Sequence, residues 1–290
     1  MTRKFTPWRV LRETIFYLLL SAVGVFMALP FVWSLLTSLK DDSEIFSTHW
    51  LPTHLTLAHY AEVFQVIPYG SYILNSFVMA GLGVITNLFL GSLAGYAYAR
   101  LRMKHKNFFF RSQVASMMIP SIITMIPTYL ILRSFPLVGG NNILGQGGYG
   151  FLNTIWAVVL PWAVGSYAVF MMRQFFMTLP EELAEAARLD GCSEFRIFWN
   201  IYLPLCKPAL ATLAIFTFQA GWNSFLWPMI VLNDPKLKTV QMGLQVFSSN
   251  HSTNYGPMMA ASIIAMLPMI LIFVFAQRYF TQGVAFEGGK

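Results

Sequence analysis

Six long apolar stretches, separated by shorter polar segments, dominate the chain. A helix needs about 20 mostly apolar residues to cross a bilayer, and none of the six has an acid in its interior. Only helices and closed barrels cross lipid, and these stretches lack the alternation of barrel strands. The pattern therefore predicts an all-α polytopic membrane protein, one transmembrane domain over residues 1–290, with spans at about 15–36, 72–99, 108–132, 153–177, 209–232 and 258–280.

Composition agrees with this class of protein. The chain is 56% hydrophobic and 11% charged, whereas soluble domains have about 25% charged residues. If the N-terminus is inside, 15 of the 19 Lys and Arg residues fall in cytosolic segments. This positive-inside bias predicts cytosolic termini. It also explains the net charge of +7, so a nucleic-acid partner is not expected.

Three polar segments then face outside, at about 37–71, 133–152 and 233–257. Each is long enough to engage a partner, and each could equally be a passive connector. Cys192 and Cys206, the only cysteines, fall on the cytosolic side. We therefore expect reduced structural thiols there and no disulfide.

The second span carries small and polar residues at four-residue steps, which places them on one helix face. They are Gly83, Asn87, Gly91 and Gly95. Small residues let helices approach closely in lipid. We expect a packing seam here, with Asn87 bonded to a neighbouring helix.

Prolines interrupt the third to sixth spans, and each one weakens its helix locally. They are Pro120, Pro127, Pro161, Pro228 and Pro268. Such kinks are common where helices line a cavity, although static bundles have them too.

The fifth span gathers amide, hydroxyl and indole groups that would be costly to expose to lipid. They are Gln219, Trp222, Asn223, Ser224 and Trp227. One interpretation is the lining of a solute pathway, where aromatic faces and amides suit a sugar. The other is hydrogen bonding between helices combined with an aromatic belt at the membrane interface.

Several functional classes lack the residues they need. No ionisable residue lies in the middle of a span, which disfavours a proton-driven carrier. The sequence has no G-x-x-x-x-G-K-[ST] phosphate loop, Cys/His metal cluster or G-x-S-x-G motif. We therefore expect no catalytic residues and no cofactor or metal in this chain.

One cytosolic segment, 180–204, is unlike the rest because it is Ala-rich and acidic. Thr178 can cap a helix that begins at Pro180, and Gly191 can end it. A second short helix is expected over about 193–202. The pattern predicts a helix–Gly–helix elbow. An interfacial position on lipid is one interpretation, but the acidic first half fits a basic groove on a protein better.

The elbow carries the sequence resemblance. Glu185-Ala186-Ala187, three residues, Gly191, nine residues and Ile201-Tyr202-Leu203-Pro204 are similar to the EAA-x3-G-x9-I-x-L-P signature of bacterial ABC importer permeases. The stretches "LPWAVGSYAVFMMRQFFMTLPEELAEAARLDG", "GWNSFLWPMIVLND" and "QRYFTQGVAFEGGK" resemble the sugar-importer branch, in particular subunits like the second permease of the maltose importer. The last four residues, 287–290, depart from that pattern.

The resemblance implies that the elbow docks in a cleft of an ATPase subunit. Glu185 would then face a basic residue, Ala186 and Ala187 would pack closely, and Gly191 would make the turn. The other residues of the expected coupling set are Phe195, Ile201, Leu203 and Pro204. The family assembly has two permeases, here expected as a heterodimer, and two ATPases that bind ATP and Mg. An external solute-binding protein completes it, and the segment 233–257 would reach toward it.

Taken together, these features predict a permease subunit of an ATP-driven sugar or oligosaccharide importer in a bacterial or archaeal cytoplasmic membrane. It would form half of the translocation pathway. A sugar phosphate, an acidic oligosaccharide or a polyol remains open as the solute. Alternatives of other classes are an ion-coupled secondary carrier acting alone and a polytopic membrane enzyme.

Overall fold

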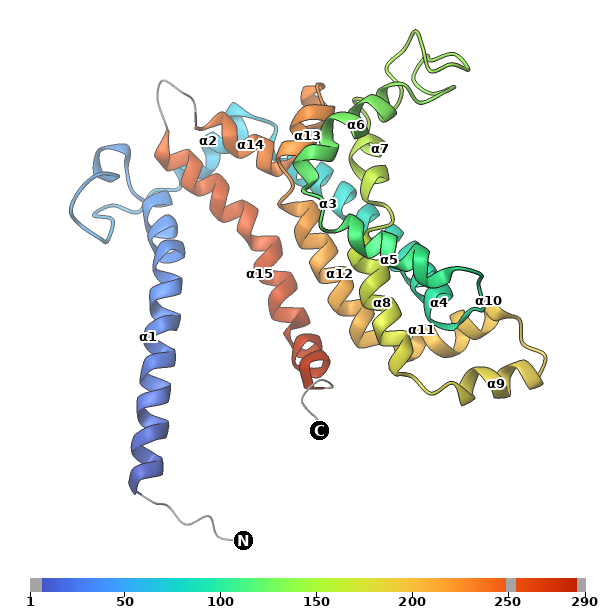
Figure 1. Cartoon of the computed structure of the whole chain (residues 1–290). Helices are drawn as coiled ribbons and strands as arrows, with labels where there is room; N and C mark the ends of the chain where they lie inside the picture. Colours follow the sequence, from blue (N-terminus) through green and yellow to red (C-terminus); the bar gives the residue numbers. More distant parts are fainter. Residues whose placement is uncertain (1–6, 249–253, 286–290) are drawn as a thin grey trace. The chain divides into compact units, whose positions relative to one another are not determined.

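A computed structural model describes residues 7–248 and 254–285 of the chain, so the departing tail 287–290 lies outside the described residues. Every regular element in the described part is a helix (Figure 1), which confirms the all-α prediction. The chain divides into two compact units, which we describe separately. Unit 1 comprises Met1–Ile67 and Leu244–Met266, and unit 2 comprises Pro68–Gly243 and Leu267–Lys290.

Three described helices are long and apolar enough to cross a membrane as single spans: Leu11–Ser38, Tyr69–Arg100 and Tyr255–Gln277. Three helix pairs pass the same test only together, because each is bent at a short break. They are Lys106–Ser116 with Ser121–Arg133 at 106°, Ile155–Trp162 with Ser166–Thr178 at 42°, and Glu194–Leu205 with Lys207–Trp222 at 82°. The described residues thus offer three to six crossings.

The predicted spans 108–132, 153–177 and 209–232 each contain a helix break. The first breaks at residues 117–120, the second at residues 163–165 after the turn containing Pro161, and the third at residues 223–225. The ring of proline removes a backbone donor and clashes with the preceding turn. Pro127, Pro228 and Pro268, in contrast, lie inside helices, so the prediction that they interrupt their spans is wrong.

Unit 1 contains α1 (Pro7–Ser38), η1 (Asp42–Glu44) and α2 (Ala58–Val66), together with the ends of two helices that continue into unit 2. These two are α14 (Val240–Val246) and α15 (Tyr255–Ala285). His59 on α2 is buried, and its Nε2 lies 2.8 Å from the Lys40 carbonyl oxygen. A Cβ on Gly256 would lie 2.3 Å from the His59 ring, so only glycine fits there.

Unit 2 holds the remaining helices. In chain order they are α3 (Tyr69–Thr86), the π-helical turn η2 (Asn87–Gly91), α4 (Ser92–Arg100), α5 (Lys106–Ser116), α6 (Ser121–Arg133), α7 (Ile155–Val159), η3 (Leu160–Trp162), α8 (Ser166–Thr178), α9 (Glu182–Leu189), α10 (Glu194–Ile197), η4 (Phe198–Tyr202), α11 (Leu203–Leu205), α12 (Lys207–Trp222), α13 (Leu226–Val231) and η5 (Pro235–Leu237).

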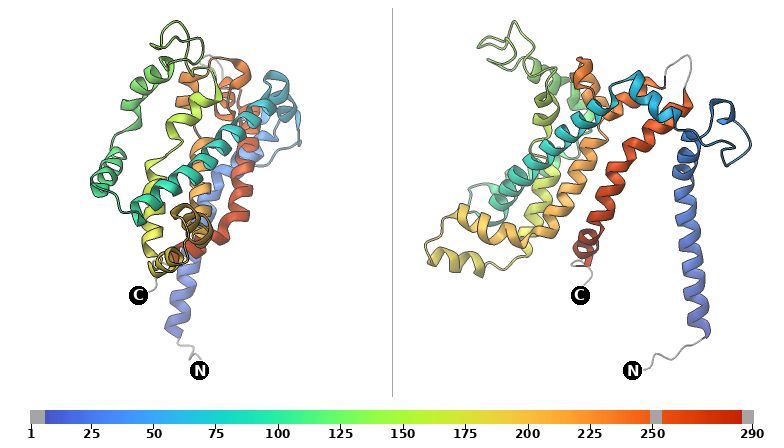
Figure 2. Two further views of the ribbon diagram at one scale, coloured as in Figure 1. Left: turned by 90° about the vertical axis from the view of Figure 1, so that its right-hand side faces the viewer. Right: turned by 180° about the vertical axis from the view of Figure 1, so that it is seen from behind.

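Two apolar clusters hold unit 2 together. One joins α4, α8, the π-helical turn η4 and α12 around Tyr96, Met172, Phe198 and Leu213. The other joins α3, α7 and α13 around Met79, Ala157, Trp227 and Val231, among others. Within unit 2, helices α9 to α11 lie at the opposite end from segment 133–152 (Figures 1 and 2). This separation agrees with the prediction that the two segments face opposite sides of the membrane.

Candidate functional site

The elbow at 180–204 forms two short helices joined at a glycine. Helix α9 ends at Leu189, and Gly191 follows with φ +78°, a left-handed conformation that glycine adopts without strain. The Cys192 N–H then donates to the Ala187 carbonyl oxygen at 2.9 Å. The chain thus turns at Gly191, directly after the first helix of the elbow.

The predicted beginning of the first helix is wrong. Helix α9 starts at Glu182, two residues after Pro180. Thr178 is instead the last residue of α8, and its hydroxyl donates to the Phe175 carbonyl oxygen at 2.8 Å. The second helix does carry a side-chain cap, because the Arg196 N–H donates to the Ser193 hydroxyl at 3.4 Å.

Burial divides α9 into two faces. Ala184 and Ala187 are buried against the cluster around Tyr96, whereas Glu185 and Ala186 are exposed. Of the two alanines predicted to pack on a partner, Ala186 is therefore available and Ala187 already packs within the chain. Leu189 is 89% exposed, which adds an apolar residue to the exposed side.

The second half of the elbow is similarly divided. Ile201 and Leu203 pack against the cluster around Tyr96, and Pro204 is exposed. Phe195 is exposed too, and its ring stacks on the Trp199 ring at a centroid distance of 6.2 Å. The exposed part of the expected coupling set is thus Glu185, Ala186, Phe195 and Pro204.

Polar contacts fix the elbow to the bundle. Glu194 accepts hydrogen bonds from Arg188 Nε at 2.7 Å and from the Tyr96 hydroxyl of α4 at 2.8 Å. The hydrogen bond from Arg188, followed by that from Tyr96, holds the pKa of the Glu194 carboxyl below its ordinary value despite partial burial. The carboxylate therefore stays ionised and joins α4, α9 and α10.

A second anchor comes from Arg100 at the end of α4. Its guanidinium donates to the Phe176 carbonyl oxygen at 2.6 Å and also to the Leu179 carbonyl oxygen. It lies 5.1 Å from the centroid of the Tyr202 ring, a cation–π distance. The Tyr202 hydroxyl in turn donates to the Pro180 carbonyl oxygen at 3.2 Å. A displacement of the elbow would therefore be passed to α4 and α8.

Only part of the predicted seam of small residues packs against a neighbouring helix. A Cβ on Gly91 would lie 2.8 Å from Ala168 Cβ, and one on Gly95 would lie 2.9 Å from the Arg173 backbone nitrogen. These two glycines therefore allow α8 to pack closely. Gly83 meets nothing within 4 Å and borders a cavity instead.

Asn87 bonds a neighbouring helix as its position suggested. Its Nδ2 donates to the Trp162 carbonyl oxygen at 2.8 Å and to the Gly83 carbonyl oxygen at 2.9 Å. Its Oδ1 accepts the Gly165 N–H at 2.9 Å. Asn87 therefore satisfies the backbone groups freed where η3 gives way to α8, and it does so from the π-helical turn of the neighbouring span.

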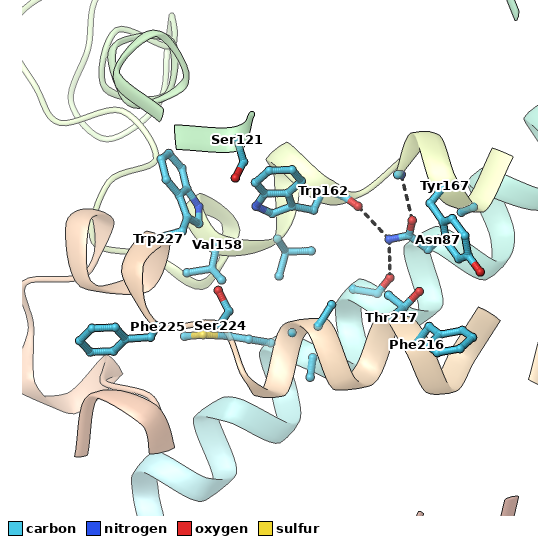
Figure 3. Close-up of a pocket in the computed structure, with 18 of the residues that line it drawn as sticks. Asn87, Ser121, Val158, Trp162, Tyr167, Phe216, Thr217, Ser224, Phe225 and Trp227 are labelled. Carbon is cyan, nitrogen blue, oxygen red and sulfur yellow. Dashed lines mark hydrogen bonds between the residues drawn. The ribbon is translucent and has the colours of Figure 1, made fainter. Parts of the chain in front are cut away.

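A cavity of about 560 Å³ lies in unit 2 between α3, α6, α8 and α12, with residues 224–227 at one end. In Figure 3, Ser121, Trp162, Ser224 and Trp227 gather at one end of it, and Asn87, Thr217 and Phe216 at the other. Most of the lining is aliphatic or aromatic, with a few hydroxyl groups.

The pathway residues predicted in the fifth span separate. Ser224 and Trp227 line the cavity, and the Trp227 Nε1 donates to the Ala157 carbonyl oxygen at 3.0 Å. Trp222 is 1% exposed and stacks on Phe218. Gln219 and Asn223 are exposed, and Asn223 Oδ1 accepts from Gln241 Nε2 at 3.4 Å. None of these three borders the cavity.

Sequence reasoning missed Ser121, Trp162 and Thr217, which also line the cavity. For the first two a signal was present, since each follows a proline at which a span breaks. The broken ends bring backbone and side-chain groups to the cavity wall. Thr217 has no such signal in an otherwise regular α12.

Comparisons with known proteins agree on the fold and family. The chain is 34% identical to the arabinooligosaccharides transport system permease protein AraQ of Halalkalibacterium halodurans, over 100% of both chains. It is 31% identical to the sn-glycerol-3-phosphate transport system permease protein UgpE of Yersinia pestis, over 93% of this chain and 95% of the relative.

A crystal structure of a bacterial ABC transporter involved in the import of the acidic polysaccharide alginate has a chain of the same fold. Its TM-score is 0.82 at 21% identity, over 96% of this chain and 100% of the other. The family described as binding-protein-dependent transport system inner membrane component matches residues 87–286. The chain belongs to this family: it is a membrane subunit of a binding-protein-dependent transport system and not itself an enzyme.

Proposed function

We propose that the chain is one of two permease subunits of an ATP-driven importer for a sugar or oligosaccharide, and that its elbow receives the movement of a separate ATPase subunit. The observation that carries this proposal is the elbow itself. It presents Glu185 and Ala186 outward, while Arg100, Glu194 and Tyr202 fix it to the bundle.

The division between exposed and buried faces supports docking. The exposed carboxylate of Glu185 lies beside the small side chain of Ala186. Together with the exposed side chains of Leu189 and Phe195, it gives the elbow both charge and apolar surface. Interfaces of this kind combine an apolar centre with charged groups that fix orientation. A basic cleft on an ATPase that binds ATP and Mg is the partner that fits it.

The remaining parts of the proposal concern assembly and orientation. We propose six crossings with both termini in the cytosol, two ATPase subunits, a second and different permease, and an extracytoplasmic solute-binding protein. The position of the elbow at the opposite end of unit 2 from segment 133–152 supports one part of this proposal, namely that these two segments lie on opposite sides of the membrane. Segment 233–257 would contact the binding protein.

The relatives support a proposal for the class of solute. One is named for arabinooligosaccharides, and the other for sn-glycerol 3-phosphate. We propose a carbohydrate or polyol derivative that passes the cavity lined by Ser224 and Trp227. Gln219, Trp222 and Asn223 would shape this region from outside the cavity.

Replacement of Glu185 tests the coupling. In proteoliposomes that contain the whole transporter, Glu185→Lys should lower ATP-driven uptake about tenfold or more, since like charges across an interface cost several kcal/mol. The neutral variant Glu185→Gln, which keeps the shape of the side chain, should lose much less. Uptake should be measured with the solute that the purified binding protein retains.

ATP hydrolysis and the amount of each subunit that remains in the complex should be measured on the same samples. These two measurements distinguish a defect in coupling from a defect in folding. The Glu185→Lys transporter should still contain the permease pair in the membrane. Equal uptake by Glu185→Lys and the unchanged protein would contradict docking through this face of α9.

A further inference from the structure

The lining of the cavity in unit 2 bears on which class of solute can enter it. Among the residues that border it there is no Asp, Glu, Lys, Arg or His. Its wall is formed mainly by aliphatic and aromatic side chains, including Trp162, Phe216 and Trp227. A charged solute would therefore find no oppositely charged side chain of this chain inside the cavity.

Two of the polar side chains that border the cavity already donate to backbone carbonyl oxygens. The Asn87 amide donates to two carbonyl oxygens, those of Gly83 and Trp162. The Trp227 indole N–H donates to the Ala157 carbonyl oxygen. What remains at the wall are the hydroxyls of Ser121, Tyr167, Thr217 and Ser224 and the indole N–H of Trp162, all of which are neutral groups.

Two helices begin at the cavity, and their N-termini carry a partial positive charge. They are α6, which starts at Ser121, and α8, which starts after Gly165. However, the Gly165 N–H is occupied by Asn87 Oδ1 at 2.9 Å. A helix terminus contributes at most about 2 kcal/mol, whereas burying an ion costs several. The helix termini therefore do not offset the cost of an anion.

We propose that this cavity takes a neutral, polyhydroxylated solute and excludes anionic ones such as a sugar phosphate or an acidic oligosaccharide. The inference rests on the proposed importer function and narrows its solute class. Indole faces of Trp162 and Trp227 meet the apolar faces of a sugar ring, and the hydroxyls of Ser121 and Ser224 meet its hydroxyl groups at the same end of the cavity (Figure 3).

A thiol placed at the wall tests this directly and needs no knowledge of the solute. In the complete transporter, Ser224→Cys is treated with hydroxyethyl methanethiosulfonate, which is neutral, and with sulfonatoethyl methanethiosulfonate, which is an anion. Gln146→Cys is the matched control, because Gln146 is exposed in segment 134–150, which has no Asp, Glu, Lys, Arg or His. Mass spectrometry of the peptide containing each position gives the two rates.

The quantity compared is the rate with the neutral reagent divided by the rate with the anionic reagent. We expect this ratio to be about tenfold or more higher at position 224 than at position 146, because the anion must leave water for an uncharged cavity. The same shift is expected with Thr217→Cys at the other end. An equal ratio at both positions would overturn the inference, yet leave the coupling measured with Glu185→Lys intact. Failure of both reagents to react at 224, with or without ATP and vanadate, would also overturn it.

Discussion

Gly83 and Gly95 occupy the same predicted face of one span, but an added Cβ atom would have different surroundings at each of them. At Gly95 an added Cβ would press on the backbone of α8 at 2.9 Å from the Arg173 nitrogen. At Gly83 the same atom would meet nothing within 4 Å. Spacing alone predicts the helix face, but the neighbouring helix decides which glycine is required.

A matched pair of substitutions measures this difference. Gly95→Ala should lower the stability of the detergent-purified transporter by about 1–3 kcal/mol, the usual cost of overpacking. Gly83→Ala makes the same chemical change in open space inside a helix, so it should raise stability by up to about 1 kcal/mol. Thermal unfolding midpoints of the two variants check this, and equal midpoints would contradict the close packing of α4 on α8.

At the scale of elements, the elbow depends on a backbone conformation as much as on its side chains. Gly191 has φ +78° and nothing within 4 Å of its missing Cβ. A side chain therefore fits in space there, but only a residue that accepts the left-handed region fits the backbone. Asn accepts this region, whereas proline is fixed near −65°.

Gly191→Pro should therefore uncouple the transporter, while Gly191→Asn should retain most of its activity. The expected loss in ATP-driven uptake for the proline variant is about tenfold or more, because the two halves of the elbow can no longer turn as they do. Uptake and ATP hydrolysis, measured together in proteoliposomes, check the pair. Equal coupling in both variants would show that the turn at Gly191 is dispensable.

The elements also show what the sequence could predict. Apolar length and charge indicated the membrane class, and the spacing around Glu185 and Gly191 indicated the helix–Gly–helix elbow. The exact breaks were not predictable, since Pro127 stays within α6 while Pro120 precedes it. A proline weakens a helix, but whether the chain bends there depends on partners such as Asn87, which bonds the broken ends from another span.

The candidate cavity was predictable only in part, for a similar reason. Polar and aromatic residues near position 223 did indicate a special region, and Ser224 and Trp227 do border the cavity. Trp222 and Asn223 point elsewhere because α12 ends at Trp222 and the chain changes direction before α13.

At the scale of the whole molecule, we propose that this chain provides a pathway and that a partner subunit supplies the energy. No described helix has an acid or base in the cavity lining, and the sequence has no phosphate-binding loop. In the proposed function, movement enters through the elbow, which lies at the end of unit 2 opposite segment 133–152 (Figure 2). The proposed assembly adds an ATPase, a second permease and a binding protein.

The most direct test of this claim is to measure which energy source drives uptake in proteoliposomes. The solute is the one that the purified binding protein retains, and the vesicles hold either the complete transporter or this chain alone. We expect uptake only with the complete transporter and with ATP on the side of the elbow. Uptake by the chain alone, driven by a proton or sodium gradient without ATP, would contradict the account.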